Sequence, residues 1–189
     1  MDSYAGVILS GGQSRRMGQD KALLKIAGKT LLARQFERLG QLGGQVWVSG
    51  SYPGFPSIED KSFAKGPLAG IASAVRFLKD QVEALLIIAV DMPLLDVETL
   101  KNFKSQVTAD GAFYVNQAIF PIWLPLTQSV IHCTELAENS DNYALIPWLH
   151  QMDAKPLEMP QCSPFMNTNT PEQWQQAICR LQGGSTHGS

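Results

Sequence analysis

The feature that most constrains the fold is the start of the chain, where an apolar stretch at residues 6–9 is followed, after Ser10, by a glycine pair. A short, continuous apolar run that ends at glycine is typical of a buried strand. Gly11 and Gly12 permit a tight turn and let backbone N–H groups approach an anion, where a Cβ would obstruct them. The segment therefore predicts a buried strand that leads into an anion-binding loop.

Three basic residues follow this glycine pair. Arg15 and Arg16 can hold phosphate oxygens through bidentate hydrogen bonds, and Lys21 adds a mobile positive charge. Their spacing matches neither G-x-x-x-x-G-K-S/T nor G-x-G-x-x-G, so this loop would bind phosphate in another way. The alternative is a purely structural turn, because a glycine turn followed by a few basic residues is common after a strand.

Length and composition limit the classes of protein to be considered. A chain of 189 residues with 44% hydrophobic content fits one domain with a substantial core. We expect that domain over residues 1–182 and a flexible tail at 183–189. The net charge of −2 argues against binding to long nucleic acids, which requires a broad basic surface. Three widely spaced cysteines fit reduced thiols, and we expect neither a signal peptide nor a membrane span, hence a cytoplasmic protein.

Apolar runs and helical spacings alternate along the chain. Strands are predicted at residues 5–10, 45–49 and 84–90, with one or two more at 112–124, broken by Pro121. Helices are predicted to end at Gly40, to begin near Pro67, to be capped by Asp96, to cover residues 126–138 and to begin again at Pro171. This alternation predicts an α/β fold with a mostly parallel sheet.

Asp91 follows the 84–90 strand directly. Ligands of open α/β sheets bind beyond the carboxyl ends of the strands, so Asp91 is expected at the same edge as the glycine-rich loop. A carboxylate beside nucleotide phosphates is best suited to hold Mg²⁺, which prefers oxygen ligands. The alternative is that Asp91 only caps the turn before Pro93.

Three further segments carry candidate binding residues. The helix start at residues 66–70 offers free N–H groups, and glycines such as Gly70 would let a base, ribose or phosphate pack against the backbone. Asp60 could accept hydrogen bonds from a nucleobase or ribose. Asn167 and Asn169 could complete a metal or phosphate shell, or simply form an Asx turn.

The histidines are scattered along the sequence, which shows no Ser–His–Asp or Cys–His order typical of nucleophilic catalysis. The residue pattern therefore favours substitution at phosphorus, catalysed by positioning and charge neutralisation.

In this order the segments resemble the molybdenum cofactor guanylyltransferases. That family shows L-x-G-G-x-x-x-R-M-G-x-D-K, G-P-L-A-G, D-x-P and N-x-N-T-P motifs, found here at residues 9–21, 66–70, 91–93 and 167–171. The resemblance implies a three-layer, Rossmann-like nucleotidyltransferase with a mostly parallel, mixed sheet. It also implies that the protein uses Mg²⁺ to transfer GMP from GTP to the terminal phosphate of molybdopterin. Pyrophosphate is released, and the guanine dinucleotide form of the cofactor is made.

The resemblance also assigns roles to residues. The implied nucleotide-binding residues are Leu9, Ser10, Gly11, Gly12, Lys21, Ser49, Asp60, Gly70 and Asp91. The implied catalytic residues are Arg15, Arg16, Lys21 and Asp91, of which Asp91 is the metal ligand, and Asn167 and Asn169 belong to the acceptor or metal shell. Ser49 stands where asparagine is frequent, and Ser10 where alanine is usual.

One segment departs from the family pattern. Residues 116–121 replace an R-x-H-P-like stretch that is expected near molybdopterin. This leaves the acceptor open and favours, as one alternative, a noncatalytic nucleotide-binding accessory protein. Because base choice depends on few contacts, a related cytidylyltransferase or a sugar- or polyol-phosphate nucleotidyltransferase also stays open. Accessory proteins of cofactor delivery are further candidate partners.

Overall fold

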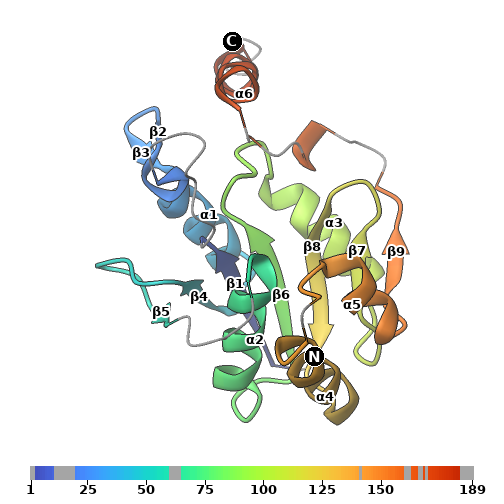
Figure 1. The fold of residues 1–189 in the computed structure, drawn as a ribbon. Coiled ribbons are helices and arrows are strands. Elements are labelled where there is room, and N and C mark those ends of the chain that lie inside the picture. The colour runs from blue at the N-terminus through green and yellow to red at the C-terminus, as the bar shows by residue number, and fades with distance from the viewer. Residues whose placement is uncertain are drawn as a thin grey trace.

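A central sheet with helices on both faces forms the body of the protein in the computed structural model (Figure 1). The structure describes residues 3–10, 20–59, 65–140, 142–159, 163–165, 168 and 170–183. The seven strands of the sheet lie in the order β5-β4-β1-β6-β8-β7-β9. Among these strands β8 is antiparallel to both of its neighbours, whereas the other pairs are parallel. The predicted α/β fold with a mostly parallel, mixed sheet is confirmed.

The elements alternate along most of the chain. The strands are β1 (Tyr4–Leu9), β2 (Lys25–Ile26), β3 (Lys29–Thr30), β4 (Gln45–Ser49), β5 (Ser57–Ile58), β6 (Ala84–Ala89), β7 (Phe113–Val115), β8 (Ile119–Pro125) and β9 (Lys155–Leu157). The α-helices are α1 (Leu31–Gly40), α2 (Pro67–Leu78), α3 (Val97–Gln106), α4 (Gln128–Glu138), α5 (Leu145–Gln151) and α6 (Pro171–Gly183). Two 3-10 helices, η1 (Lys21–Leu23) and η2 (Ser163–Phe165), complete the described elements, and β2 pairs with β3 in a small separate hairpin.

Helices α1 and α3 share one face of the sheet, and α2, α4 and α5 share the other. On the first face, the Tyr4 hydroxyl donates to the Leu42 carbonyl just after α1, and Lys104 of α3 lies over the Tyr4 ring. On the second face, an ion pair between Arg76 and Glu138 joins α2 to α4, which also contacts α5. The result is the expected three-layer arrangement.

The core is centred on β1 and β6, which are paired in parallel. Val7 and Ile8 are fully buried, as are residues 85–88 of β6, because both faces of these strands are covered. Gly6 favours the close approach of α1, because a Cβ there would lie only 3.0 Å from Leu39 Cδ1. The continuous apolar runs of the sequence therefore form the middle of the sheet.

The prediction that Pro121 breaks a strand is wrong. Pro121 lies inside β8, at an irregularity where the pairing with β7 jumps from Ile122 to Ile119. Proline has no N–H to give to a ladder, so it is tolerated where the ladder is already interrupted. The two strands are instead separated by the turn at residues 116–118.

Other boundaries differ by small amounts. Helix α4 begins at Gln128 rather than 126, because the Thr127 side chain caps it by accepting a hydrogen bond from Val130 N. Asp96 caps α3 as predicted, through the N–H of Thr99. Among the described residues, no helix is long and apolar enough to span a membrane.

Candidate active site

The carboxyl ends of β1, β4 and β6 meet at one edge of the sheet. Leu9 at the end of β1 is the register partner of both Ser49 in β4 and Ala89 in β6. The Ser10 hydroxyl, directly after β1, donates to the Ser49 carbonyl. Candidate nucleotide-binding residues from two separate strands are therefore in direct contact, as the position of parallel strand ends predicts.

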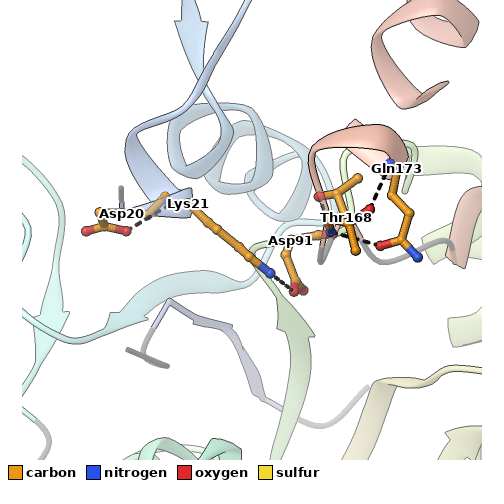
Figure 2. Close-up of polar contacts among 7 residues, drawn as sticks. Asp20, Lys21, Asp91, Thr168 and Gln173 are labelled. Atoms are coloured by element: carbon orange, nitrogen blue, oxygen red, sulfur yellow. Dashed lines mark hydrogen bonds and ion pairs between the residues drawn. The ribbon is translucent and has the colours of Figure 1, made fainter. Parts of the chain in front are cut away.

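A cation and a carboxylate face each other at this edge. Lys21 Nζ lies 3.0 Å from Asp91 Oδ2, and their side chains are only 14% and 20% exposed. Figure 2 shows Lys21 extending from η1 toward Asp91, which stands just beyond the end of β6. Partial burial weakens solvent screening, so this pair interacts more strongly than a surface ion pair would. The two candidate catalytic residues that the structure describes are thus brought together across 70 residues of sequence.

The lysine is held in place by its neighbour, Asp20. One carboxylate oxygen of Asp20 accepts a hydrogen bond from Ala22 N at 2.9 Å and so caps η1 (Figure 2). The other oxygen accepts a hydrogen bond from the Tyr52 hydroxyl, also at 2.9 Å. Burial raises the pKa of Tyr52, so its hydroxyl is protonated and can donate at neutral pH. The loop after β4 therefore braces the element that carries Lys21.

Gly70 packs tightly against the end of β4. A Cβ at Gly70 would lie 2.5 Å from Ser49 Oγ and 3.0 Å from Leu9 Cδ2, both of which are candidate binding residues. Gly66, which precedes α2, has φ = +66°, a conformation that favours glycine. The helix begins at Pro67 as predicted, and its first turn adjoins the ends of β1 and β4.

One residue of the late asparagine-rich segment, Thr168, also reaches this edge. Its N–H donates to the Asp91 carbonyl at 2.9 Å. The Thr168 hydroxyl donates to the same oxygen at 3.2 Å. Thr170 and Gln173 exchange hydrogen bonds at the start of α6, which confirms the capping pattern expected there (Figure 2). The sequence pointed to the neighbouring asparagines, but nothing in it indicated that Thr168 contacts Asp91.

Several predicted site residues lie outside the described residues. These are Gly11, Gly12, Arg15, Arg16, Asp60, Asn167 and Asn169. Their roles stay predictions. The described members of the predicted site lie at the edge where β1, β4 and β6 end. The contacts above link Leu9, Ser10, Ser49 and Gly70 into one group, and they pair Lys21 with Asp91.

The segment that departs from the family pattern lies on another part of the sheet, at the turn between β7 and β8. Asn116 Nδ2 donates to Glu158 Oε1 at 2.5 Å, and the Gln117 amide donates to the other oxygen of that carboxylate. All three side chains are exposed. The turn that replaces the expected basic stretch is therefore organised by an acidic residue just after β9.

The site is suited to binding and moving a charged phosphate group. Lys21 offers a cation, Asp91 offers hard oxygen donors, and the exposed Gly66 leaves the backbone at the start of α2 accessible. Within the described ranges, no group of three or more His, Cys, Asp and Glu residues could hold a metal by itself. Mg²⁺ is commonly held by one or two carboxylates together with substrate phosphates, and Asp91 fits that donor pattern.

Comparisons with known proteins identify the family of the chain. Residues 6–153 match the family model described as MobA-like NTP transferase domain. A curated molybdenum cofactor guanylyltransferase of Xanthomonas euvesicatoria pv. vesicatoria (strain 85-10) is 34% identical over 93% of this chain and 94% of its own length. A protein of the same name from Rhodobacter capsulatus is 28% identical over 94% of this chain and 96% of its own.

Solved structures with the same fold are more distant in sequence. The crystal structure of molybdopterin-guanine dinucleotide biosynthesis protein A from Archaeoglobus fulgidus superposes with a TM-score of 0.74 at 20% identity, covering 95% of this chain and 99% of that one. The 2-C-methyl-D-erythritol 4-phosphate cytidylyltransferase of Thermus thermophilus has a TM-score of 0.65 at 13% identity, covering 93% and 98%. These two likenesses establish the fold alone.

Proposed function

The chain belongs to the family of MobA-like NTP transferase domains and is a nucleotidyltransferase, and we propose that it transfers GMP from GTP to the terminal phosphate of molybdopterin. Pyrophosphate is released, and the product is the guanine dinucleotide form of the molybdenum cofactor. The observation that carries the proposal is the pairing of Lys21 with Asp91 at the edge where β1, β4 and β6 end. The relatives named as guanylyltransferases support GTP as the nucleotide.

The proposed reaction is a substitution at phosphorus. A terminal phosphate oxygen of molybdopterin attacks the α-phosphorus of GTP and forms a new P–O bond. The bond from the α-phosphorus to the α,β-bridging oxygen breaks, and pyrophosphate leaves with that electron pair. The protein contributes by positioning the reactants and neutralising charge, which is the main source of catalysis in such transfers.

The described residues have distinct roles in this reaction. Lys21 stabilises the negative charge that grows on the departing pyrophosphate, since its ammonium group lies at the strand edge where phosphates would bind. Leu9 and Ser10 line the nucleotide through their backbone, and Ser49 lies beside Gly70 on the base or ribose side. Arg15 and Arg16 are proposed to hold the triphosphate together with the loop that contains Gly11 and Gly12.

We propose that Asp91 holds Mg²⁺ together with the phosphates of the nucleotide. The support is its position two residues beyond β6, its low exposure and its hard oxygen donors. When bound, the ion offsets the phosphate charge and favours the departure of pyrophosphate. Asn167 and Asn169 are proposed to complete the acceptor or metal shell, because Thr168 between them bonds to the Asp91 carbonyl. Asp60 is proposed to contact the guanine nucleotide.

The proposed substrates are charged and water-soluble, so we also propose that the protein works in the cytoplasm. The accessory proteins of cofactor delivery stay a prediction of the family resemblance.

The test uses purified protein, molybdopterin and Mg²⁺ with either GTP or CTP. The proposal predicts pyrophosphate release and a guanine dinucleotide product with GTP, together with a rise in Tm on addition of GTP and Mg²⁺. Stabilisation and turnover with CTP but not GTP would instead identify a cytidylyltransferase. Binding of GTP without pyrophosphate release in the presence of molybdopterin would identify a noncatalytic binding protein.

A further inference from the structure

The turn at residues 91–93 is held by hydrogen bonds to three successive backbone carbonyls. The first of these carbonyls belongs to Asp91 and accepts from both the N–H and the hydroxyl of Thr168. These two bonds come from a segment 77 residues further along the chain. Asp91 is therefore fixed through its backbone as well as through its contact with Lys21.

The next two carbonyls accept hydrogen bonds from side chains of α1. Gln35 Nε2 donates to the Met92 carbonyl at 2.7 Å, and Arg38 Nη1 donates to the Pro93 carbonyl at 3.1 Å. The same Arg38 nitrogen also lies 3.4 Å from Gln35 Oε1, which links the two donors. Burial lowers the pKa of Arg38 to about 10, which leaves it charged at neutral pH. Helix α1 thus holds the turn immediately after Asp91.

Gln35 is an unusual residue for its position. It is fully buried on the face of α1 that otherwise presents Leu31, Leu32 and Leu39 to the core. A leucine at this position would continue the apolar stripe of an amphipathic helix. A buried amide is kept without a large desolvation penalty only where it makes hydrogen bonds, and here those bonds are made with the turn and with Arg38. Its place in the core therefore serves the 91–93 turn.

We propose that Gln35 is a positioning residue: with Arg38 and Thr168, it fixes the 91–93 turn so that the Asp91 carboxylate faces Lys21 and the bound nucleotide. This inference rests on the proposed function for the role of Asp91. A small displacement of a carboxylate that holds a metal with the substrate phosphates weakens metal binding and slows transfer, as outer-shell substitutions commonly do. Gln35 itself touches neither metal nor substrate.

The main test compares Gln35→Met with Leu39→Val. Methionine has nearly the size of glutamine but cannot donate to the Met92 carbonyl, whereas Leu39→Val loosens the same helix near Gly6 without removing a bond to the turn. The first readout is hydrogen exchange of the amides at residues 88–95, followed by mass spectrometry. We expect faster exchange in Gln35→Met and wild-type exchange there in Leu39→Val. This readout requires no substrate and so does not depend on the proposed function.

The second readout is the concentration of Mn²⁺ bound in the presence of GTP without acceptor, followed by electron paramagnetic resonance. We expect Gln35→Met to weaken Mn²⁺ binding by about 10- to 100-fold and to lower kcat by a similar factor. Thr168→Val removes the hydroxyl but keeps the N–H, so it should weaken Mn²⁺ binding and lower kcat by smaller factors. Leu39→Val should lower Tm and leave both quantities at the wild-type value.

Wild-type exchange at residues 88–95 together with wild-type Mn²⁺ binding in Gln35→Met would overturn the inference, as would equal changes in Leu39→Val. A wild-type protein that neither binds Mn²⁺ with GTP nor releases pyrophosphate would instead overturn the proposed function. In that case the exchange experiment still decides whether Gln35 holds the turn.

Discussion

Polar side chains are organised differently in two regions of the central sheet. Where β1, β4 and β6 end, they are partly or fully buried and converge on the turn that begins at Asp91. At the turn between β7 and β8, the exposed side chains of Asn116 and Gln117 bond to the exposed Glu158. Buried, fully bonded groups are fixed in place before a ligand arrives, whereas exposed groups can rearrange. The comparison indicates that the groups at the proposed nucleotide site are pre-organised, whereas the exposed turn at residues 116–118 tolerates substitution.

The largest effect is expected for Asp91→Ala. Loss of the carboxylate removes the proposed metal ligand and the 3.0 Å contact with Lys21, so kcat/KM should fall by roughly 1,000-fold, or about 4 kcal/mol. Pyrophosphate release and far-ultraviolet circular dichroism check activity and fold together. Asp110→Ala, at an exposed aspartate, is the matched control. Turnover close to wild type in a folded Asp91→Ala protein would rule out this role.

Lys21→Met should have the next largest effect. Methionine keeps most of the side-chain length but removes the charge that is proposed to stabilise pyrophosphate, so we expect kcat to fall about 100-fold. Lys25→Met, at an exposed lysine of the β2–β3 hairpin, should change kcat little. Steady-state kinetics with GTP as the varied substrate measures both. An equal loss of kcat in the two variants would mean that Lys21 acts through the overall charge of the protein and not through a specific contact.

Tyr52→Phe should have a moderate effect, because it removes one hydrogen bond to Asp20 and loosens the element that carries Lys21. We expect a loss of about 1 kcal/mol in stability and a rise in KM for GTP of about 5-fold. Tyr143→Phe, in the other half of the chain, serves as control. A KM for GTP that does not change would show that this bond does not position Lys21.

The stability difference between the wild-type protein and Tyr52→Phe should depend on pH. The folded pKa of Tyr52 is raised above the ordinary value of 10.0, so the folded state holds this proton more tightly than the unfolded state. The contribution of the hydroxyl to stability is therefore complete below the ordinary pKa of 10.0 and is lost as the pH rises through the folded pKa. Urea unfolding of both proteins from about pH 7 to about pH 11 should show a constant difference that shrinks once the pH passes the ordinary tyrosine pKa. A difference that grows with pH would contradict the assigned direction.

The smallest effect is expected for Glu158→Gln. This change weakens the exposed contacts with Asn116 and Gln117, and surface substitutions of this kind alter stability by about 0.5 kcal/mol or less. KM for GTP should be unchanged, and KM for molybdopterin should change about 2-fold at most. A large loss of kcat would show that the turn at residues 116–118 is as closely organised as the proposed nucleotide site, and the comparison would fail.

The two regions also differ in how far sequence predicts them. The strands β1, β4 and β6 are continuous or nearly continuous apolar runs, and the helices between them carry caps or a first-turn proline, so their position follows from local signals. Helix α5 was not predicted, because its N-cap residue Ala144 makes no side-chain bond and Pro147 lies within it. Strand β9 is three residues long and contains Pro156, which gives no recognisable alternation.

Within the site, the sequence indicates those residues whose charged side chains lie in a short recognisable motif. The sequence predicts Lys21 and Asp91 at one edge of the sheet because parallel strands end there, and the structure brings them together. Gln35 could not be recognised, since its partner Met92 is 57 residues away and only the packing of α1 against the turn brings them into contact. A polar residue on an otherwise apolar helix face is the one local sign it leaves in the sequence.

The most direct test of the whole account follows the phosphates of GTP during turnover. Wild-type protein is incubated with molybdopterin, Mg²⁺ and GTP labelled with ³²P at either the α- or the γ-position. The account predicts that the α-label appears in a molybdopterin-containing dinucleotide, in amounts equal to the pyrophosphate that carries the γ-label. Label recovered as inorganic phosphate and GDP, or a dinucleotide formed from CTP and not from GTP, would contradict it.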